Sequence, residues 1–271
     1  MPLEIKKTNA LINPKNLKLK VLLYGLAGSG KTSWMSTAPE LGAGVCETGL
    51  GKGLLSVAAK DFEYCELNSY DDFNAFCSNV VFKDKQVLGL DSLSEMVRTF
   101  IKDKALSIPR AKGESQKRQL GVPELDDYGI IAELTRKLLK KLLDQDKHIV
   151  VTSGLRIDKP DPENYQADML IGPDLPGQMF LGSTAMFDLV LCLRTRAKLQ
   201  NPKDAKSKYI ERFILTESNG SGIIAKNRLS ISGSKSFFPS EVIFNPETGE
   251  GTFPWFLNRA IEEYQKFCNK S

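Results

Sequence analysis

The chain has 271 residues, of which 41% are hydrophobic and 26% are charged. This length and composition suit one large domain with a sizeable core, or one domain with a small appendage. The sequence contains no apolar run near the roughly 20 residues that cross a bilayer, and its start lacks a signal-peptide core. We therefore expect a cytoplasmic protein with no membrane partner. Five scattered cysteines without a Cys-X-X-Cys pair argue against a disulfide framework and a zinc site.

The net charge of +4 is unevenly distributed along the chain. Segment 102–118 holds six basic residues against two acidic ones, and segment 194–212 holds seven against two. A local excess of this kind favours a polyanionic partner. The alternative is that both segments are solvated, lysine-rich loops.

Strand-like and helix-like segments alternate, which predicts an α/β fold with a mostly parallel central sheet flanked by helices. The expected strands are residues 19–24, 44–46, 62–67, 86–90, 149–152, 187–193 and 213–216, with a hairpin at 241–253. The expected helices are residues 32–37, 70–80, 92–102, 125–144 and 255–267. Glycine, proline and polar residues predict a mobile loop at 103–123 and a long loop at 154–183.

Residues 25–32 read Gly-Leu-Ala-Gly-Ser-Gly-Lys-Thr, directly after the first expected strand. In this P-loop pattern the glycines let the backbone wrap around phosphate groups, with backbone N–H groups pointing inward. Lys31 would reach the β- and γ-phosphates, and the Thr32 hydroxyl would hold Mg²⁺. An ordinary glycine-rich turn is the alternative. The residues predicted to bind the nucleotide are Gly25, Leu26, Ala27, Gly28, Ser29, Gly30, Lys31, Thr32 and Ser33.

Two acidic positions complete the predicted site. Asp91 follows the apolar strand 86–90, where a carboxylate can hold the Mg²⁺ shell; its alternative role is to cap the following helix. Hydrolysis also needs a group that orients or deprotonates water. We predict Glu47 for this role, because its strand is expected beside the P-loop strand, and Glu95 is the alternative base. An exposed turn glutamate is the other interpretation of Glu47.

The order of these motifs resembles a known family. A P-loop is followed by Glu47, a strand ending in Asp-Ser, a basic loop, a long helix, a strand, a long loop and Lys-Asn-Arg at 226–228. This order resembles the core ATPase domain of RecA-like recombinases, most closely the core-only RecA-like ATPases of phages, over residues 17–230. The chain has Val45, Ser153 and Leu229-Ser230 where such proteins commonly have Asp, Gln or His, and Phe-Gly.

The resemblance implies ATP as the nucleotide. It also implies that Lys226 and Arg228 act in catalysis across a subunit interface, on the ATP of a neighbour; a solvated strand end is the alternative. A first DNA-binding loop would lie around 103–121 and a second around 154–183. The predicted nucleic-acid contacts are Lys104, Arg110, Lys112, Lys117 and Arg118.

By this resemblance the chain has an N-terminal extension (1–16), a RecA-like ATPase core (17–230), and a C-terminal hairpin and helix packed on the core (231–271). It would be a DNA-dependent ATPase of the host cytoplasm that assembles as a filament or ring on single-stranded DNA. Its role would be annealing or strand exchange in phage recombination or replication, with a single-stranded-DNA-binding protein as a further partner.

The alternative function is a nucleotide-gated switch or assembly module with a protein partner. Aromatic residues for base stacking are sparse in the predicted DNA-binding loops, where Tyr165 and Phe180 are the candidates, and this favours the alternative or backbone-only DNA contact. A small-molecule kinase is disfavoured, because no lid or acceptor-site signal is evident.

Overall fold

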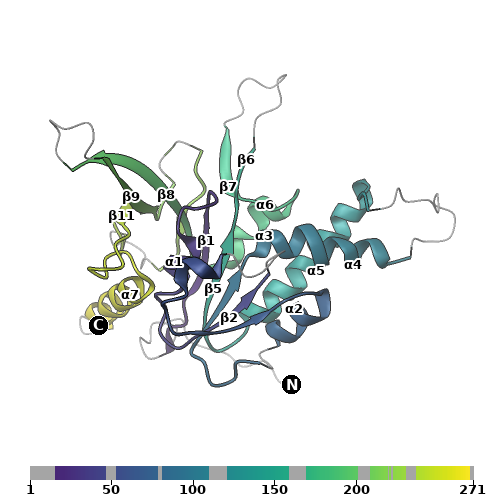
Figure 1. The fold of residues 1–271 in the computed structure, drawn as a ribbon, viewed down its shortest axis with the longest axis horizontal. Coiled ribbons are helices and arrows are strands. Elements are labelled where there is room, and N and C mark those ends of the chain that lie inside the picture. The colour runs from purple at the N-terminus through teal and green to yellow at the C-terminus, as the bar shows by residue number, and fades with distance from the viewer. Residues whose placement is uncertain are drawn as a thin grey trace.

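The computed structural model describes residues 16–46, 53–78, 81–109, 121–158, 169–200, 208–218, 220, 222–229 and 236–268. Among these residues the main sheet has nine strands, in the order β11-β9-β8-β1-β5-β4-β2-β3, with β10 also paired to β8. Figure 1 shows this sheet at the centre of the molecule. The strands are β1 (Lys20–Gly25), β2 (Leu41–Val45), β3 (Glu63–Glu66), β4 (Val87–Asp91), β5 (His148–Ser153), β8 (Leu189–Leu199), β9 (Lys208–Leu215), β10 (Lys226–Asn227) and β11 (Glu241–Ile243).

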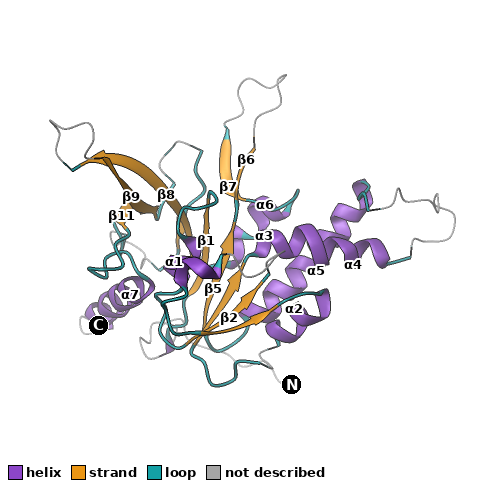
Figure 2. Ribbon diagram, in the orientation of Figure 1, coloured by secondary structure: helices purple, strands orange, loops and turns teal. Residues whose placement is uncertain are grey.

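Helices cover both faces of the sheet. One buried cluster joins the sheet to α2, α3 and α5, and the other joins it to α1 and α7. Figure 2 shows α2, α4 and α5 on one side of the sheet and α7 on the other. The helices are α1 (Lys31–Met35), α2 (Tyr70–Cys77), α3 (Leu93–Met96), the π-helical turn η4 (Val97–Ile101), α4 (Lys102–Ser107), α5 (Leu125–Leu143), α6 (Met179–Gly182), α7 (Phe253–Cys268) and the 3₁₀ turns η3 (Leu54–Val57) and η5 (Thr184–Met186).

The centre of the sheet is parallel, from β3 through β2, β4, β5 and β1 to β8. The predicted α/β fold with a mostly parallel sheet is therefore confirmed. Central strand β1 is apolar along nearly its whole length, because it is buried on both faces. The carboxyl ends of its parallel neighbours gather at one edge of the sheet, and this edge is where ligands bind in open α/β folds.

The strand order corrects one expectation. We expected the second strand beside the P-loop strand, but β2 pairs with β4 and β3. The neighbours of β1 are β5 and β8. Crossover connections decide this order, and an apolar run in the sequence carries no information about them. In the observed order, β5 lies between the P-loop strand β1 and β4, the strand that ends at Asp91.

Two of the expected loops contain regular structure. The long loop expected at 154–183 holds a separate antiparallel pair, β6 (Leu155–Asp158) and β7 (Leu170–Pro173), followed by α6. The basic connection 194–212 lies largely within strands, because β8 runs on to Leu199 and β9 begins at Lys208. In Figure 1 both pairs extend beyond the main body of the molecule.

The C-terminal helix α7 packs on the face of the sheet that is also covered by the P-loop helix α1. In the segment where we expected a hairpin, β11 pairs with β9, and a turn follows in which the Asn245 N–H donates to the Glu250 carbonyl at 2.9 Å. Helix α7 then packs against Trp34 of α1, with ring centroids of Phe253 and Phe256 6.0 and 6.1 Å from the indole. Within the part of the chain that the structure describes, no helix is long and apolar enough to span a bilayer.

Candidate nucleotide-binding site

The P-loop connects β1 to α1 at the carboxyl edge of the sheet. Gly28 and Gly30 have φ angles of +75° and +104°, in the left-handed region that favours glycine. Gly25 needs to be glycine for a different reason, since a Cβ there would lie 2.4 Å from the Leu193 carbonyl oxygen of the neighbouring strand. The loop therefore has the backbone that a phosphate cradle requires.

The Lys31 ammonium lies across this loop. Its Nζ donates to the carbonyl oxygens of Gly25 and Leu26 at 3.0 and 2.9 Å. Burial lowers the pKa of Lys31, while the nearby Asp91 carboxylate opposes that shift. A phosphate group in the loop would favour the charged form in the same way, so Lys31 is placed to exchange carbonyl contacts for phosphate contacts.

Asp91 meets the P-loop from the end of β4. Its Oδ2 accepts a hydrogen bond from Thr32 Oγ1 at 2.6 Å, and its Oδ1 accepts one from the Thr152 hydroxyl of β5. Mg²⁺ prefers oxygen ligands such as these hydroxyl and carboxylate groups. The pair Thr32 and Asp91 therefore fits the predicted metal-binding role. The cap of α3 is Ser92, not Asp91, so the alternative role of Asp91 as a helix cap is wrong.

Of the two predicted bases, Glu95 is the one that lies in the described part of the chain. Glu47 lies outside the described residues. The chain enters that segment beside Asp91, since Val45 pairs with Asp91 and the Cys46 N–H donates to the Asp91 carbonyl at 2.7 Å. Glu95 lies half-buried in α3, one turn beyond Asp91. Glu95 therefore lies at the carboxyl edge of the sheet, and the role of Glu47 stays a prediction from the sequence.

A cavity of about 290 Å³ opens on the P-loop. Its lining includes Ser56 of η3 and Arg212 of β9, which the sequence analysis did not single out for this site. No motif marks either residue, because each comes to the P-loop from an element that is distant from it in the sequence. The full lining is Gly28, Gly30, Lys31, Thr32, Ser33, Gly53, Ser56 and Arg212.

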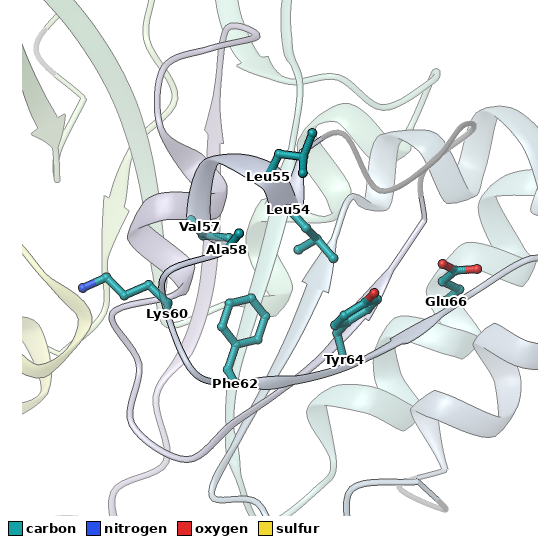
Figure 3. Close-up of a pocket in the computed structure, with 8 residues that line it drawn as sticks. All are labelled: Leu54, Leu55, Val57, Ala58, Lys60, Phe62, Tyr64 and Glu66. Atoms are coloured by element: carbon teal, nitrogen blue, oxygen red, sulfur yellow. The ribbon is translucent and has the colours of Figure 1, made fainter.

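A larger cavity of about 520 Å³ is lined by other residues of η3. Figure 3 shows the rings of Phe62 and Tyr64 beside Leu54 and Ala58, with the Lys60 ammonium directed away. The lining is mainly apolar and lacks the P-loop residues. The phosphate-binding chemistry therefore belongs to the smaller cavity, although η3 contributes side chains to both.

Lys226 and Arg228 lie toward the opposite end of the sheet from the P-loop. Strand β10 pairs with the beginning of β8, and the Arg228 N–H donates to the Asp188 carbonyl at 2.9 Å. The Lys226 ammonium donates to the Thr184 carbonyl, and burial lowers its pKa to about 8. Arg228 is exposed. Neither side chain is near the P-loop of its own subunit, so a role on ATP needs a second copy of the chain.

The predicted nucleic-acid residues are only partly described. Lys104 is exposed on α4, with its ammonium 5.5 Å from the centre of the Tyr70 ring. The predicted residues Arg110, Lys112, Lys117 and Arg118 lie outside the described residues, as does Tyr165. Phe180 is buried on α6, which removes it as a surface for base stacking.

A second cavity of about 290 Å³ lies between the elements that lead into both predicted DNA-binding loops. Arg98, Lys102 and Arg156 bring three cations to it, Asp174 brings one carboxylate, and Tyr128 brings an aromatic ring. Sequence analysis missed Arg98 and Arg156, because the first lies in an expected helix and the second in a segment expected to be irregular.

This basic cavity is joined to the P-loop edge by buried hydroxyl groups. The Oγ atoms of Ser94 and Ser153 lie 2.8 Å apart, and Ser153 Oγ also accepts from the Asp174 N–H at 3.1 Å. Asp174 in turn forms an ion pair with Arg98. Ser153, which stands where the resembling family commonly has Gln or His, thus connects the end of β5 to the residues of the basic cavity.

Comparison with known proteins gives a family match over most of the chain. The sequence pattern of a family described as the AAA domain matches residues 17–229. A search of curated proteins gave no match. The structure is similar to the KaiC-like protein of the hyperthermophilic archaeon Pyrococcus horikoshii, with 16% identity, 84% of this chain and 85% of that chain covered, and a TM-score of 0.43.

Two further solved structures are similar over much of the chain. The flagellar accessory protein FlaH of Methanocaldococcus jannaschii has 10% identity, 89% and 92% coverage of the two chains, and a TM-score of 0.39. The RadB recombinase has 10% identity, 73% and 79% coverage, and a TM-score of 0.35.

Proposed function

Because the chain belongs to the AAA domain family of P-loop proteins, we propose that it hydrolyses ATP with Mg²⁺ and acts on single-stranded DNA. The observation that carries the first part is the contact of Thr32 with Asp91 at 2.6 Å. It brings the P-loop hydroxyl and a strand-end carboxylate together where a nucleotide-bound Mg²⁺ needs both. ATP, rather than another nucleoside triphosphate, follows from the resemblance to RecA-like ATPases.

The residues divide the chemistry between them. The P-loop amides and Lys31 bind the phosphates, and Thr32 and Asp91 orient the metal-bound triphosphate. Mg²⁺, when bound, neutralises charge on the phosphate oxygens. In hydrolysis, a water oxygen bonds to the γ-phosphorus while the bond from that phosphorus to the β–γ bridging oxygen breaks. Glu47 or Glu95 accepts the proton of the water, and Lys226 and Arg228 of a neighbouring copy stabilise the charge on the transferred group.

Single-stranded DNA is proposed as the partner because of the basic cavity that Arg98, Lys102 and Arg156 line. It lies beside the ends of both predicted DNA-binding loops, and its cations suit backbone phosphates. The half-exposed Tyr128 ring offers a surface for one base. The proposed role is annealing or strand exchange in phage recombination or replication.

A protein partner is the second candidate, and one observation favours it. Ile210 and Leu199 are 69% and 40% exposed on the β8–β9 hairpin, and they lie on the same face of it. Exposed apolar side chains on a projecting hairpin suit a protein surface. In this case the ATPase would be a switch that controls assembly with that partner.

The experiment is ATP hydrolysis by the wild-type chain with and without oligo-dT, combined with fluorescence anisotropy of labelled oligo-dT at two salt concentrations. We expect stimulation of hydrolysis by DNA, and DNA affinity that falls steeply with salt as counterions are released. Lys102→Ala should weaken DNA binding, whereas Lys137→Ala, which removes an exposed lysine of α5, should not. Hydrolysis that is indifferent to DNA would favour the protein-partner function.

A further inference from the structure

Arg212 lies directly beside the P-loop, although it comes from a distant segment of the chain. Its side chain is so close to Gly30 that a Cβ built on that glycine would be 2.9 Å from Arg212 Nε. It also lines the small cavity together with Lys31 and Thr32. The guanidinium is therefore at the mouth of the phosphate cradle of its own subunit.

Strand pairing explains how Arg212 reaches this place. Arg212 pairs with Thr195 across the β8–β9 hairpin, two residues before Ile214, so the two side chains leave β9 on the same face. Ile214 is fully buried in the cluster that contains Trp34 of the P-loop helix. Arg212 lies on the same face of β9 as Ile214, and its side chain lies beside Gly30, the residue before α1.

Arg212 differs in its partners from Arg196 and Lys198, two other basic residues of the hairpin. Arg196 and Lys198 both form ion pairs with Glu211, and Arg196 also pairs with Glu241. No carboxylate in the described part of the chain pairs with the Arg212 guanidinium. The exposed side chain is thus available to an anion that enters the cavity.

We propose that Arg212 binds the phosphate chain of the nucleotide held by the P-loop of the same subunit. The proposal rests on the proposed nucleotide-binding function and adds a residue supplied in cis by the β8–β9 hairpin. Guanidinium groups suit this role, because they are always charged and donate two parallel hydrogen bonds to phosphate oxygens. A bound nucleotide would in this way connect β9, at Arg212, to the P-loop.

The experiment measures the Kd of fluorescent N-methylanthraniloyl-AMPPNP, a non-hydrolysable ATP analogue, in Mg²⁺ for four proteins: wild type, Arg212→Ala, Arg212→Lys and Arg194→Ala. Arg194 is a matched control, since it is exposed on the opposite face of the same hairpin. We expect Arg212→Ala to raise Kd by about tenfold or more, Arg212→Lys to raise it less, and Arg194→Ala to change it less than about twofold. Thermal unfolding checks that each variant is folded.

A Lys31→Ala variant separates the two claims. If Lys31→Ala loses binding while the Kd of Arg212→Ala equals that of Arg194→Ala, the role of Arg212 is refuted and the nucleotide site is supported. If the wild type does not bind the analogue, or Lys31→Ala binds it as tightly as the wild type, the proposed nucleotide site itself fails. Hydrogen exchange of the paired amides in β8 and β9 gives an independent test: saturating nucleotide should protect these amides more in the wild type than in Arg212→Ala, because only the wild type can form the proposed contact.

Discussion

The side chain of Asp91 shows how the end of a strand becomes part of a binding site. Both oxygens of its carboxylate accept hydrogen bonds, one from the P-loop residue Thr32 and one from Thr152. The second bond exists because β5 lies between β1 and β4. Asp91 is therefore fixed before any metal arrives, and a rigid ligand costs less ordering when the metal binds.

His148 is the one histidine of the chain, and it makes the stability depend on pH. Its Nδ1 accepts a hydrogen bond from the Leu19 N–H at 3.1 Å, and burial lowers its pKa to about 4. Between about pH 6.5 and pH 4, the unfolded chain binds a proton that the folded chain does not. Stability from this residue is therefore full above pH 6.5 and falls as the pH decreases.

Urea unfolding at pH 7.5, 6 and 5 measures this effect. We expect the difference in unfolding free energy between wild type and His148→Gln to shrink as the pH falls, because glutamine can accept the same hydrogen bond without binding a proton. Parallel pH profiles for the two proteins would show that His148 does not contribute to the acid sensitivity.

At the scale of elements, the P-loop helix depends on the C-terminal helix. Trp34 is completely buried, its Nε1 donates to the Gly251 carbonyl at 2.6 Å, and its ring meets Phe256 of α7 edge-on. Helix α1 has only five residues and cannot be stable alone. The packing of α7 therefore holds the start of α1 at the P-loop.

Phe256→Ala tests this dependence. Removing a fully buried phenylalanine should lower the unfolding free energy by about 3–5 kcal/mol, and it should also weaken nucleotide binding by loosening α1. Chemical denaturation and nucleotide titration measure the two effects. Asn258→Ala, at an exposed position of the same helix, is the control. A variant with lower stability but unchanged affinity for nucleotide would contradict the coupling of α7 to the P-loop.

Local patterns predicted much of the fold. The helix expected at 125–144 is α5 (Leu125–Leu143), and the strand expected at 86–90 is β4, because hydrophobic periodicity and apolar runs report directly on local burial. The pair β6 and β7 was missed, since its strands are short and lie in a segment rich in proline and glycine. The place of β2 was also predicted wrongly, because strand order depends on contacts distant in sequence.

The same distinction separates the parts of the site. The P-loop and Asp91 are recognisable from adjacent residues, and the structure places them together. Thr152 and Arg212 reach the site from other strands of the sheet and Ser56 reaches it from η3, and no residue near them in sequence marks this. The basic cavity is another case, because Arg156 is far from Arg98 and Lys102 in the chain.

In the whole molecule, the role proposed for Arg228 would need a second copy of the chain. Arg228 lies toward the opposite end of the sheet from the P-loop, so one chain cannot bring both to the same ATP. If Arg228 acts on a neighbour, Lys31→Ala and Arg228→Ala should each have little ATPase activity, while a mixture of the two should recover part of it. The recovery arises where an intact P-loop faces an intact arginine.

Steady-state ATPase assays of each variant alone and of the mixture at the same total concentration measure this recovery. A mixture whose rate equals the average of the two separate rates would contradict the role in trans. Two Arg228→Ala preparations mixed with each other provide the control for concentration effects on assembly.

The most direct test of the ATPase site at Thr32 and Asp91 is ATP hydrolysis in Mg²⁺ by wild type, Asp91→Asn and Asp84→Asn. Asparagine can still accept a hydrogen bond from Thr152 but lacks the charge that Mg²⁺ coordination favours, and Asp84 is an exposed carboxylate whose side chain is 78% accessible. We predict hydrolysis by the wild type, a loss of about 100-fold or more in Asp91→Asn, and no change in Asp84→Asn. Equal rates for wild type and Asp91→Asn would contradict the assignment of this edge of the sheet as the ATPase site.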